Sequence, residues 1–126
     1  MRSWVGAVVT GVASGILSAI VAVVLLSRMW AACDVGINSS ANALGLLLFT
    51  APLVAVAGGI SAALAFWLVV RTGKRWSVIA ACAGAACATV IVVWTTVATQ
   101  HNPSGDYPAP LCVDNIPQWW PDAIPI

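Results

Sequence analysis

The chain has 126 residues, of which 61% are apolar and 7% are charged, and its formal net charge at pH 7 is +1. Because a soluble domain has about 25% charged residues, this composition, with a mean hydropathy of +0.98, excludes an ordinary soluble protein and favours an integral membrane protein. It also provides no basic stripe for nucleic acid, so no nucleic-acid partner is expected.

Three long runs without a charged residue follow one another along the chain, at residues 4–26, 41–70 and 76–99. Each is longer than the roughly 18–20 apolar residues that cross about 30 Å of hydrocarbon as a helix. The sequence therefore predicts an all-α fold, with a small bundle of three transmembrane helices at about 4–28, 41–70 and 76–99 in a transmembrane domain of residues 1–99. The lipid bilayer is then the first expected partner.

The first run is expected to be a retained anchor. The letters "WAAC" at residues 30–33 loosely resemble a lipoprotein cleavage box. However, the apolar run is longer than the about 7–15 residues of a signal peptide, and Arg28 interrupts it before the cysteine. In the second run, Pro52 lacks a backbone N–H and predicts a kink.

Small residues recur at every fourth position in all three runs, and such stripes let helix backbones approach closely in lipid. They predict that the three helices pack on one another. The alternative is that one stripe, above all the GxxxG motif of Gly11 and Gly15, serves a partner or self-association. The stripe residues are Ala7, Gly11, Gly15 and Ala19 in the first run, Ala55, Gly59 and Ala63 in the second, and Ala80, Gly84 and Ala88 in the third.

Charged residues predict the orientation in the membrane. Arg71, Lys74 and Arg75 crowd the short connection between the second and third runs, and short basic loops stay in the cytoplasm. We therefore expect these three residues to form a cytoplasmic anchor. The protein is expected to be a multi-pass protein of the cell membrane, with a cytoplasmic N-terminus and an extracytoplasmic C-terminus. All four acidic residues fall in 27–40 and 100–126, on the outer side, and only the basic Arg28 dissents.

Four cysteines divide by position along the chain. Cys33 and Cys112 fall outside the three runs, in the outer segments, where the compartment permits a disulfide between them. The alternative is two free thiols in an oxidising space. Cys82 and Cys87 lie five positions apart within the third run, so they cannot bond to each other on one helix, and we expect them to be small packing residues.

Catalytic chemistry is not predicted anywhere in the chain. No Asp, Glu, Lys, Arg or His lies within the three runs, and His101 is the only histidine. A single histidine cannot by itself hold a haem or a zinc ion, and no phosphate loop or nucleophile motif is present. We expect no catalytic residues, no metal, no cofactor and no enzymatic activity.

Residues 100–126 form a tail rich in proline and tryptophan, which predicts an extended extracytoplasmic segment without a regular helix. Its apolar side chains either rest on the membrane interface and the helix ends or form the docking surface for a partner, since tryptophan is favoured at binding hot spots. The residues expected to make these contacts are Ile116, Pro117, Trp119, Trp120 and Pro121.

A cysteine followed by the pattern N-x-P-x-W-W-P closes the chain, at Cys112 and residues 115–121. With three apolar runs, this ending resembles a loose group of uncharacterised small three-helix integral membrane proteins of actinobacterial type. The resemblance implies no activity, cofactor or partner.

Three functions are compatible with these observations. The first is a non-enzymatic membrane protein that acts through contacts, as an accessory subunit or assembly partner of another membrane protein or of its own copies, with the outer loop and tail as recognition surface. The second is a homo-oligomeric pore, or holin-like permeabiliser, built through Gly11 and Gly15. The third is a thiol-redox membrane protein that uses Cys33 or Cys112.

Overall fold

The computed structural model describes residues 2–35, 39–73, 77–102 and 111–126. Within these ranges the chain is helical and contains no strand, which confirms the all-α prediction. The elements in chain order are α1 (Arg2–Ala32), α2 (Ser39–Gly45), the π-helical η1 (Leu46–Thr50), α3 (Ala51–Val70), α4 (Ser77–Gln100) and the 3-10 turn η2 (Val113–Asn115).

Three of the described helical spans are long and apolar enough to cross a membrane, as predicted. They are Trp4–Ala32 in α1, Ser40–Val70 through α2, η1 and α3, and Ser77–Gln100 in α4. α1 continues beyond the expected residue 28 and ends at Ala32, directly before Cys33. The helix therefore carries Trp30 and Cys33 to one end of the bundle.

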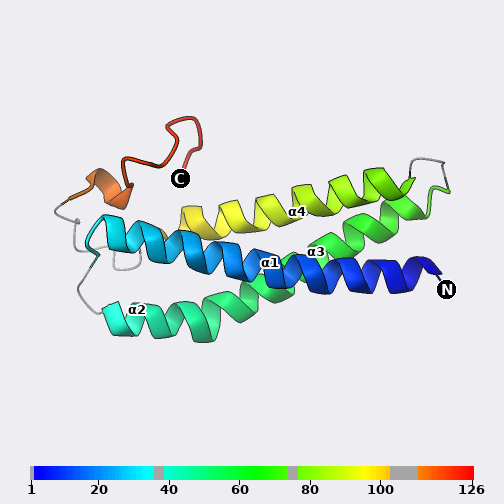
Figure 1. The fold of residues 1–126 in the computed structure, drawn as a ribbon, viewed down its shortest axis with the longest axis horizontal. Helices are drawn as coiled ribbons and strands as arrows, with labels where there is room; N and C mark the ends of the chain where they lie inside the picture. Colours follow the sequence, from blue (N-terminus) through cyan, green and yellow to red (C-terminus); the bar gives the residue numbers. More distant parts are fainter. Residues whose placement is uncertain (1, 36–38, 74–76, 103–110) are drawn as a thin grey trace.

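Figure 1 shows the long helices running lengthwise, with α1 crossing α3 near the middle of the molecule. The described tail lies at the end of the molecule where α1 ends and α2 begins, and the start of α1 lies at the opposite end, near the end of α3 (Figure 1). We call the end with the tail the cap end. At this end α2 and η1 diverge from α1 and α4 (Figure 1).

Glycines permit the crossing of α1 and α3. A Cβ atom added at Gly11 would lie 2.8 Å from the carbonyl oxygen of Gly59, and one added at Gly15 would clash with the carbonyl oxygen of Ala55. Ser18 packs in the same way against Gly58, where a Cβ would meet its hydroxyl. Any larger residue at these positions would push the backbones apart.

The π-helical turn η1 accommodates Pro52. The N–H of Ala51 bonds to the carbonyl oxygen of Leu46, five residues earlier, and Pro52 follows near the start of α3. A proline ring clashes with the carbonyl four residues before it, and one wider turn relieves that clash. The predicted irregularity at Pro52 is therefore a π turn that precedes the proline.

The core is largest at the cap end. Leu26 and Met29 of α1, Leu46 of η1, and Val93 and Val97 of α4 form one buried cluster. At the opposite end a smaller cluster contains Ala7, Phe66 and Ala81. The large side chains thus gather next to the tail, while small residues let α1 and α3 approach closely at their crossing.

Candidate functional site

A disulfide ties the tail to the end of α1. Cys33 follows the last residue of α1 and bonds to Cys112, with an S–S distance of 2.05 Å and a Cα–Cα distance of 5.2 Å. Cys33 is completely buried. The predicted disulfide is therefore present, and it brings together residues that are 79 positions apart.

The side chain of Trp30 connects α1 to the end of α4. Its indole N–H is shared between the carbonyl oxygens of Gln100, at 3.3 Å, and His101, at 3.2 Å. The last carbonyls of a helix have no partner within the helix, so the indole satisfies groups that α4 leaves open. Trp30 also packs against the core cluster at the cap end.

Tryptophan N–H groups also hold the tail, which is short of donors because of its prolines. The indole of Trp94 on α4 donates to the carbonyl oxygen of Pro125, and that of Trp120 to Ile124, each at 2.8 Å. Two backbone hydrogen bonds, from Trp120 to Pro117 and from Ile124 to Pro121, close turns. The described tail is thus a folded chain of turns, in contrast to the extended path expected from its prolines.

Consecutive left-handed residues reverse the chain after Cys112. Asp114 has a φ of 52° and Asn115 a φ of 58°, and both residue types adopt this region more easily than most. Asn115 is only 2% exposed, and its amide nitrogen donates to the side-chain oxygen of Asn102 at 2.9 Å. Asp114 and Asn115 were not among the predicted site residues, although adjacent Asp and Asn residues are a turn signal.

The Trp-Trp pair divides between the interior and the surface. Trp120 packs against the core cluster, while Trp119 is 48% exposed; their ring centroids are 6.1 Å apart in an edge-to-face arrangement. Of the other predicted contact residues, Pro117 is buried, Ile116 is half-buried and Pro121 is exposed. We call residues 30–35, 100–102 and 111–126 the cap.

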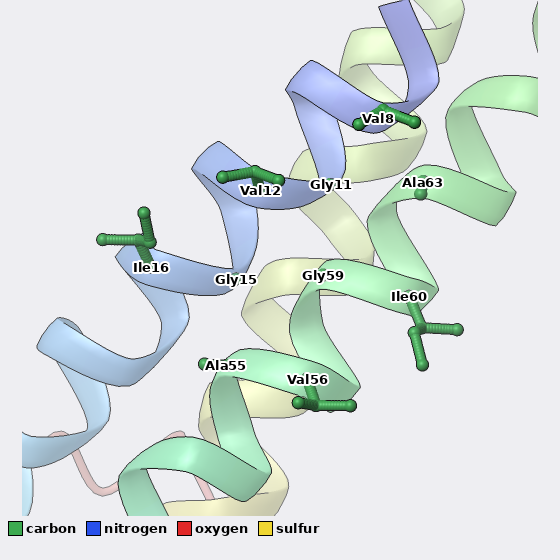
Figure 2. A pocket seen from close by; sticks show the side chains of 10 residues that line it. All are labelled: Val8, Gly11, Val12, Gly15, Ile16, Ala55, Val56, Gly59, Ile60 and Ala63. Atoms are coloured by element: carbon green, nitrogen blue, oxygen red, sulfur yellow. The ribbon is translucent and has the colours of Figure 1, made fainter. Parts of the chain in front are cut away.

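The predicted packing stripes of α1 and α3 meet, and on α4 Gly84 of the predicted stripe lies near Ala65 of α3. Gly11 and Gly15 contact α3 around Gly59, with Ala55 and Ala63 beside them, as Figure 2 shows. Ala7 is buried against Phe66 and Ala81, and Ala19 is half-buried. On α4 the buried residues are Ala81, Ala85, Val93 and Val97, while Gly84 and Ala88 are half-buried and Ala80 is exposed.

An apolar groove of about 400 Å³ follows the crossing of α1 and α3. Figure 2 shows Val12 and Ile16 standing on one side of the glycine contact and Val56 and Ile60 on the other. A second groove, of about 550 Å³, lies between α1 and α4, and the tail forms part of its wall. We call it the cap groove; its lining includes Leu17, Val21 and Leu25 of α1, Val90, Val93 and Trp94 of α4, and Trp120 and Ile124 of the tail.

Among the predicted cytoplasmic anchor residues, Arg71 directly follows α3 and is exposed, with its guanidinium carbon 4.3 Å from the ring centroid of Trp67. Lys74 and Arg75 lie outside the described residues. Cys82 and Cys87, expected as packing residues, are both exposed on α4. In the part of the chain that the structure describes, no three His, Cys, Asp or Glu side chains gather where they could hold a metal ion.

No protein-family model matches the chain, and neither a curated protein nor a solved structure matches it. The resemblance of the tail to small three-helix membrane proteins of actinobacterial type therefore stays a prediction. The groups available for function are therefore the apolar and hydrogen-bonding side chains of the cap and of the helix surfaces.

Proposed function

We propose that the protein is a non-enzymatic, multi-pass protein of the cell membrane that acts through contacts, as an accessory subunit or assembly partner. The recognition surface is the cap. One observation carries this proposal: Trp119 is exposed on a segment that a disulfide and two tryptophan hydrogen bonds already hold in place.

A fixed segment favours binding because ordering a flexible chain costs free energy when a complex forms. The cap is already ordered when the chain folds, so a complex forms without this cost of ordering. Tryptophan is among the residues that dominate interface energies, and Trp119 needs no rearrangement to meet a partner. Val113, on the same segment, is a second exposed apolar side chain, with 83% of its surface exposed.

Membrane embedding is supported by the exposed sides of the helices. Large apolar residues with more than half of their surface exposed include Leu47, Leu48 and Phe49 of η1 and Ile79 and Val90 of α4. Such a surface is unfavourable in water and favourable against hydrocarbon. The basic 71–75 connection supports an inward position for the end of α3, which leaves the cap on the extracytoplasmic side.

No structural observation favours either alternative function, the homo-oligomeric pore or the thiol-redox protein. The pore was motivated by the GxxxG motif, but Gly11 and Gly15 already contact α3 within one chain. The thiol-redox hypothesis depends on Cys33 and Cys112. These two cysteines are bonded to each other, and Cys33 is completely buried. The contact function is therefore the one we propose.

Co-purification from native membranes tests the proposal. We expect another membrane protein to co-purify with the wild-type protein in a fixed ratio. The Trp119→Ala variant should no longer co-purify with it, while its disulfide formation and thermal stability stay unchanged. Val113→Ala is the matched control, since it removes another exposed apolar side chain of the tail and should weaken the association less. Equal recovery of associated proteins with wild type and Trp119→Ala would exclude the cap as recognition surface.

A further inference from the structure

Arg28 is the basic residue that the predicted topology leaves unexplained. Of the five Lys and Arg residues, it alone lies in the sequence near the outer end of a predicted helix, while the others are at position 2 or within 71–75. It is exposed and has no ion pair among the described residues. A cation near the outer membrane boundary without an acidic partner in the described structure points to an external anion.

The position of Arg28 on α1 associates it with the cap groove. It follows Leu25 by three residues and Val21 by seven, and both line the groove. Residues at these spacings lie on one face of an α-helix. Arg28 therefore stands on the groove-lining face of α1, one turn beyond Leu25 towards the cap end.

The cap groove has the dimensions and polarity of an acyl-chain site. It follows α1 from Leu17 to Leu25, a separation of eight positions, which is about 12 Å at the helical rise. Among the described residues of its wall, the one hydroxyl belongs to Thr89 and donates to the carbonyl oxygen of Ala85 at 3.0 Å. The described wall thus presents no hydroxyl without a partner, and the groove suits a hydrocarbon.

Tryptophans lie where the groove meets the cap. Trp94 and Trp120 both line it, and the N–H of each is directed to a tail carbonyl, at Pro125 and Ile124. Indoles with an apolar body and a satisfied polar edge prefer the headgroup depth of a bilayer. The groove therefore extends from headgroup depth into the hydrocarbon.

We propose that the cap groove binds one acyl chain of a glycerophospholipid from the extracytoplasmic leaflet, and that the guanidinium of Arg28 pairs with its phosphate. Charge complementarity selects this occupant over a second copy of the chain. An apolar transmembrane helix in the groove would bring hydrocarbon against Arg28, whereas a phospholipid supplies the anion. The inference rests on the proposed membrane embedding but not on partner recognition by Trp119.

Native mass spectrometry of the purified, disulfide-bonded protein, titrated with palmitoyl-oleoyl phosphatidylglycerol, tests the charge contact. We expect one lipid that binds more tightly than the rest, and Arg28→Gln to weaken it about tenfold, the lower range for a hydrogen bond to a charged group. Arg71→Gln is the matched control because Arg71 is an exposed arginine at a helix end away from the groove. It should leave the affinity unchanged.

A second pair of variants tests the groove. Val90→Trp places a bulky ring into the cap groove, and Val12→Trp does the same in the groove at the crossing of α1 and α3. Only Val90→Trp should remove the tight lipid. Should this variant fail to form the disulfide, the arginine pair decides alone, because those substitutions change only exposed side chains.

Equal lipid affinity in the Arg28→Gln and Arg71→Gln proteins would overturn the proposal and leave only non-specific lipid around the helices. A dimer in the spectra that is absent for Val90→Trp would also overturn the proposal, because a second copy of the chain would then occupy the cap groove. Either result leaves the co-purification test of Trp119 untouched, because the lipid titration uses purified protein without a partner.

Discussion

Gly15 shows how a single hydrogen in place of a methyl group sets the distance between two helices. Its Cα lies so close to α3 that a Cβ atom would collide with the carbonyl oxygen of Ala55. A backbone atom cannot rotate away as a side chain can, so the two helices would have to separate. At the other extreme, Gly45 has nothing within 4 Å of such a Cβ.

Gly15→Ala is therefore expected to lower the free energy of unfolding in detergent by about 1–3 kcal/mol, the usual cost of overpacking. Gly45→Ala is the control; it should stabilise the protein by up to about 1 kcal/mol, because alanine is the better helix former. Both values follow from reversible denaturant unfolding. An unchanged stability for Gly15→Ala would contradict the close contact of α1 and α3.

Trp119 and Trp120 are adjacent in the sequence, but replacing each of them by alanine should change the free energy of unfolding by different amounts. Trp120→Ala removes a side chain from the cap-end cluster and its hydrogen bond to Ile124, so we expect a loss of at least about 2 kcal/mol. Trp119→Ala should stay within about 0.5 kcal/mol, as for other surface substitutions. Thermal unfolding in the same detergent compares them, and equal losses would contradict the division of the pair.

At the level of elements, indole side chains replace the hydrogen bonds that helix ends and a proline-rich tail cannot make for themselves. Trp30 donates to the end of α4, and Trp94 donates from α4 to the tail. Where water is excluded, as in hydrocarbon or a buried contact, a backbone group without a hydrogen bond costs several kcal/mol. Each tryptophan therefore combines packing with the satisfaction of a backbone carbonyl.

Trp30→Phe keeps an aromatic ring but removes the donor to Gln100 and His101, and should cost about 1 kcal/mol of stability. Amide exchange should rise in the last turn of α4. Trp94→Phe, the matched control, removes the donor to Pro125 and should raise exchange in the tail instead. The same exchange pattern in both variants would argue against separate roles.

At the scale of the whole molecule, the disulfide connects the ordered tail to the bundle. It closes a loop that contains α2, η1, α3 and α4 and leaves α1 outside, since Cys33 and Cys112 are 79 residues apart. The chain-entropy model assigns about 4–5 kcal/mol to a loop of this size, an upper value here because lipid already restricts the unfolded chain. Membrane insertion, which depends on the apolar helices, does not require it.

The double variant Cys33→Ser with Cys112→Ser should lose up to about 4 kcal/mol of stability and still partition into membranes. Cys82→Ser with Cys87→Ser, two exposed thiols on α4, should leave the disulfide and the ordered tail intact. Denaturant unfolding with and without reductant measures both pairs. A wild-type protein that is insensitive to reductant, with a disulfide confirmed to be reduced, would contradict the contribution of the bridge.

Sequence alone determined the helical class and the three long spans, because uncharged runs of this length satisfy their backbone groups as helices where water is absent. It predicted the Cys33–Cys112 disulfide with two free thiols as the alternative, and tertiary structure decided for the bond by bringing the two Cα atoms to 5.2 Å. The face that each helix buries was decided by tertiary structure, since runs that are apolar all round have no preferred side. On α4 the fully buried alanines are Ala81 and Ala85, while Gly84 and Ala88 of the predicted stripe are half-buried and Ala80 is exposed. Tertiary structure also divided Trp119 from Trp120, because the direction of each ring follows from the turn at Pro117 and from the carbonyl of Ile124, neither of which a residue pattern specifies.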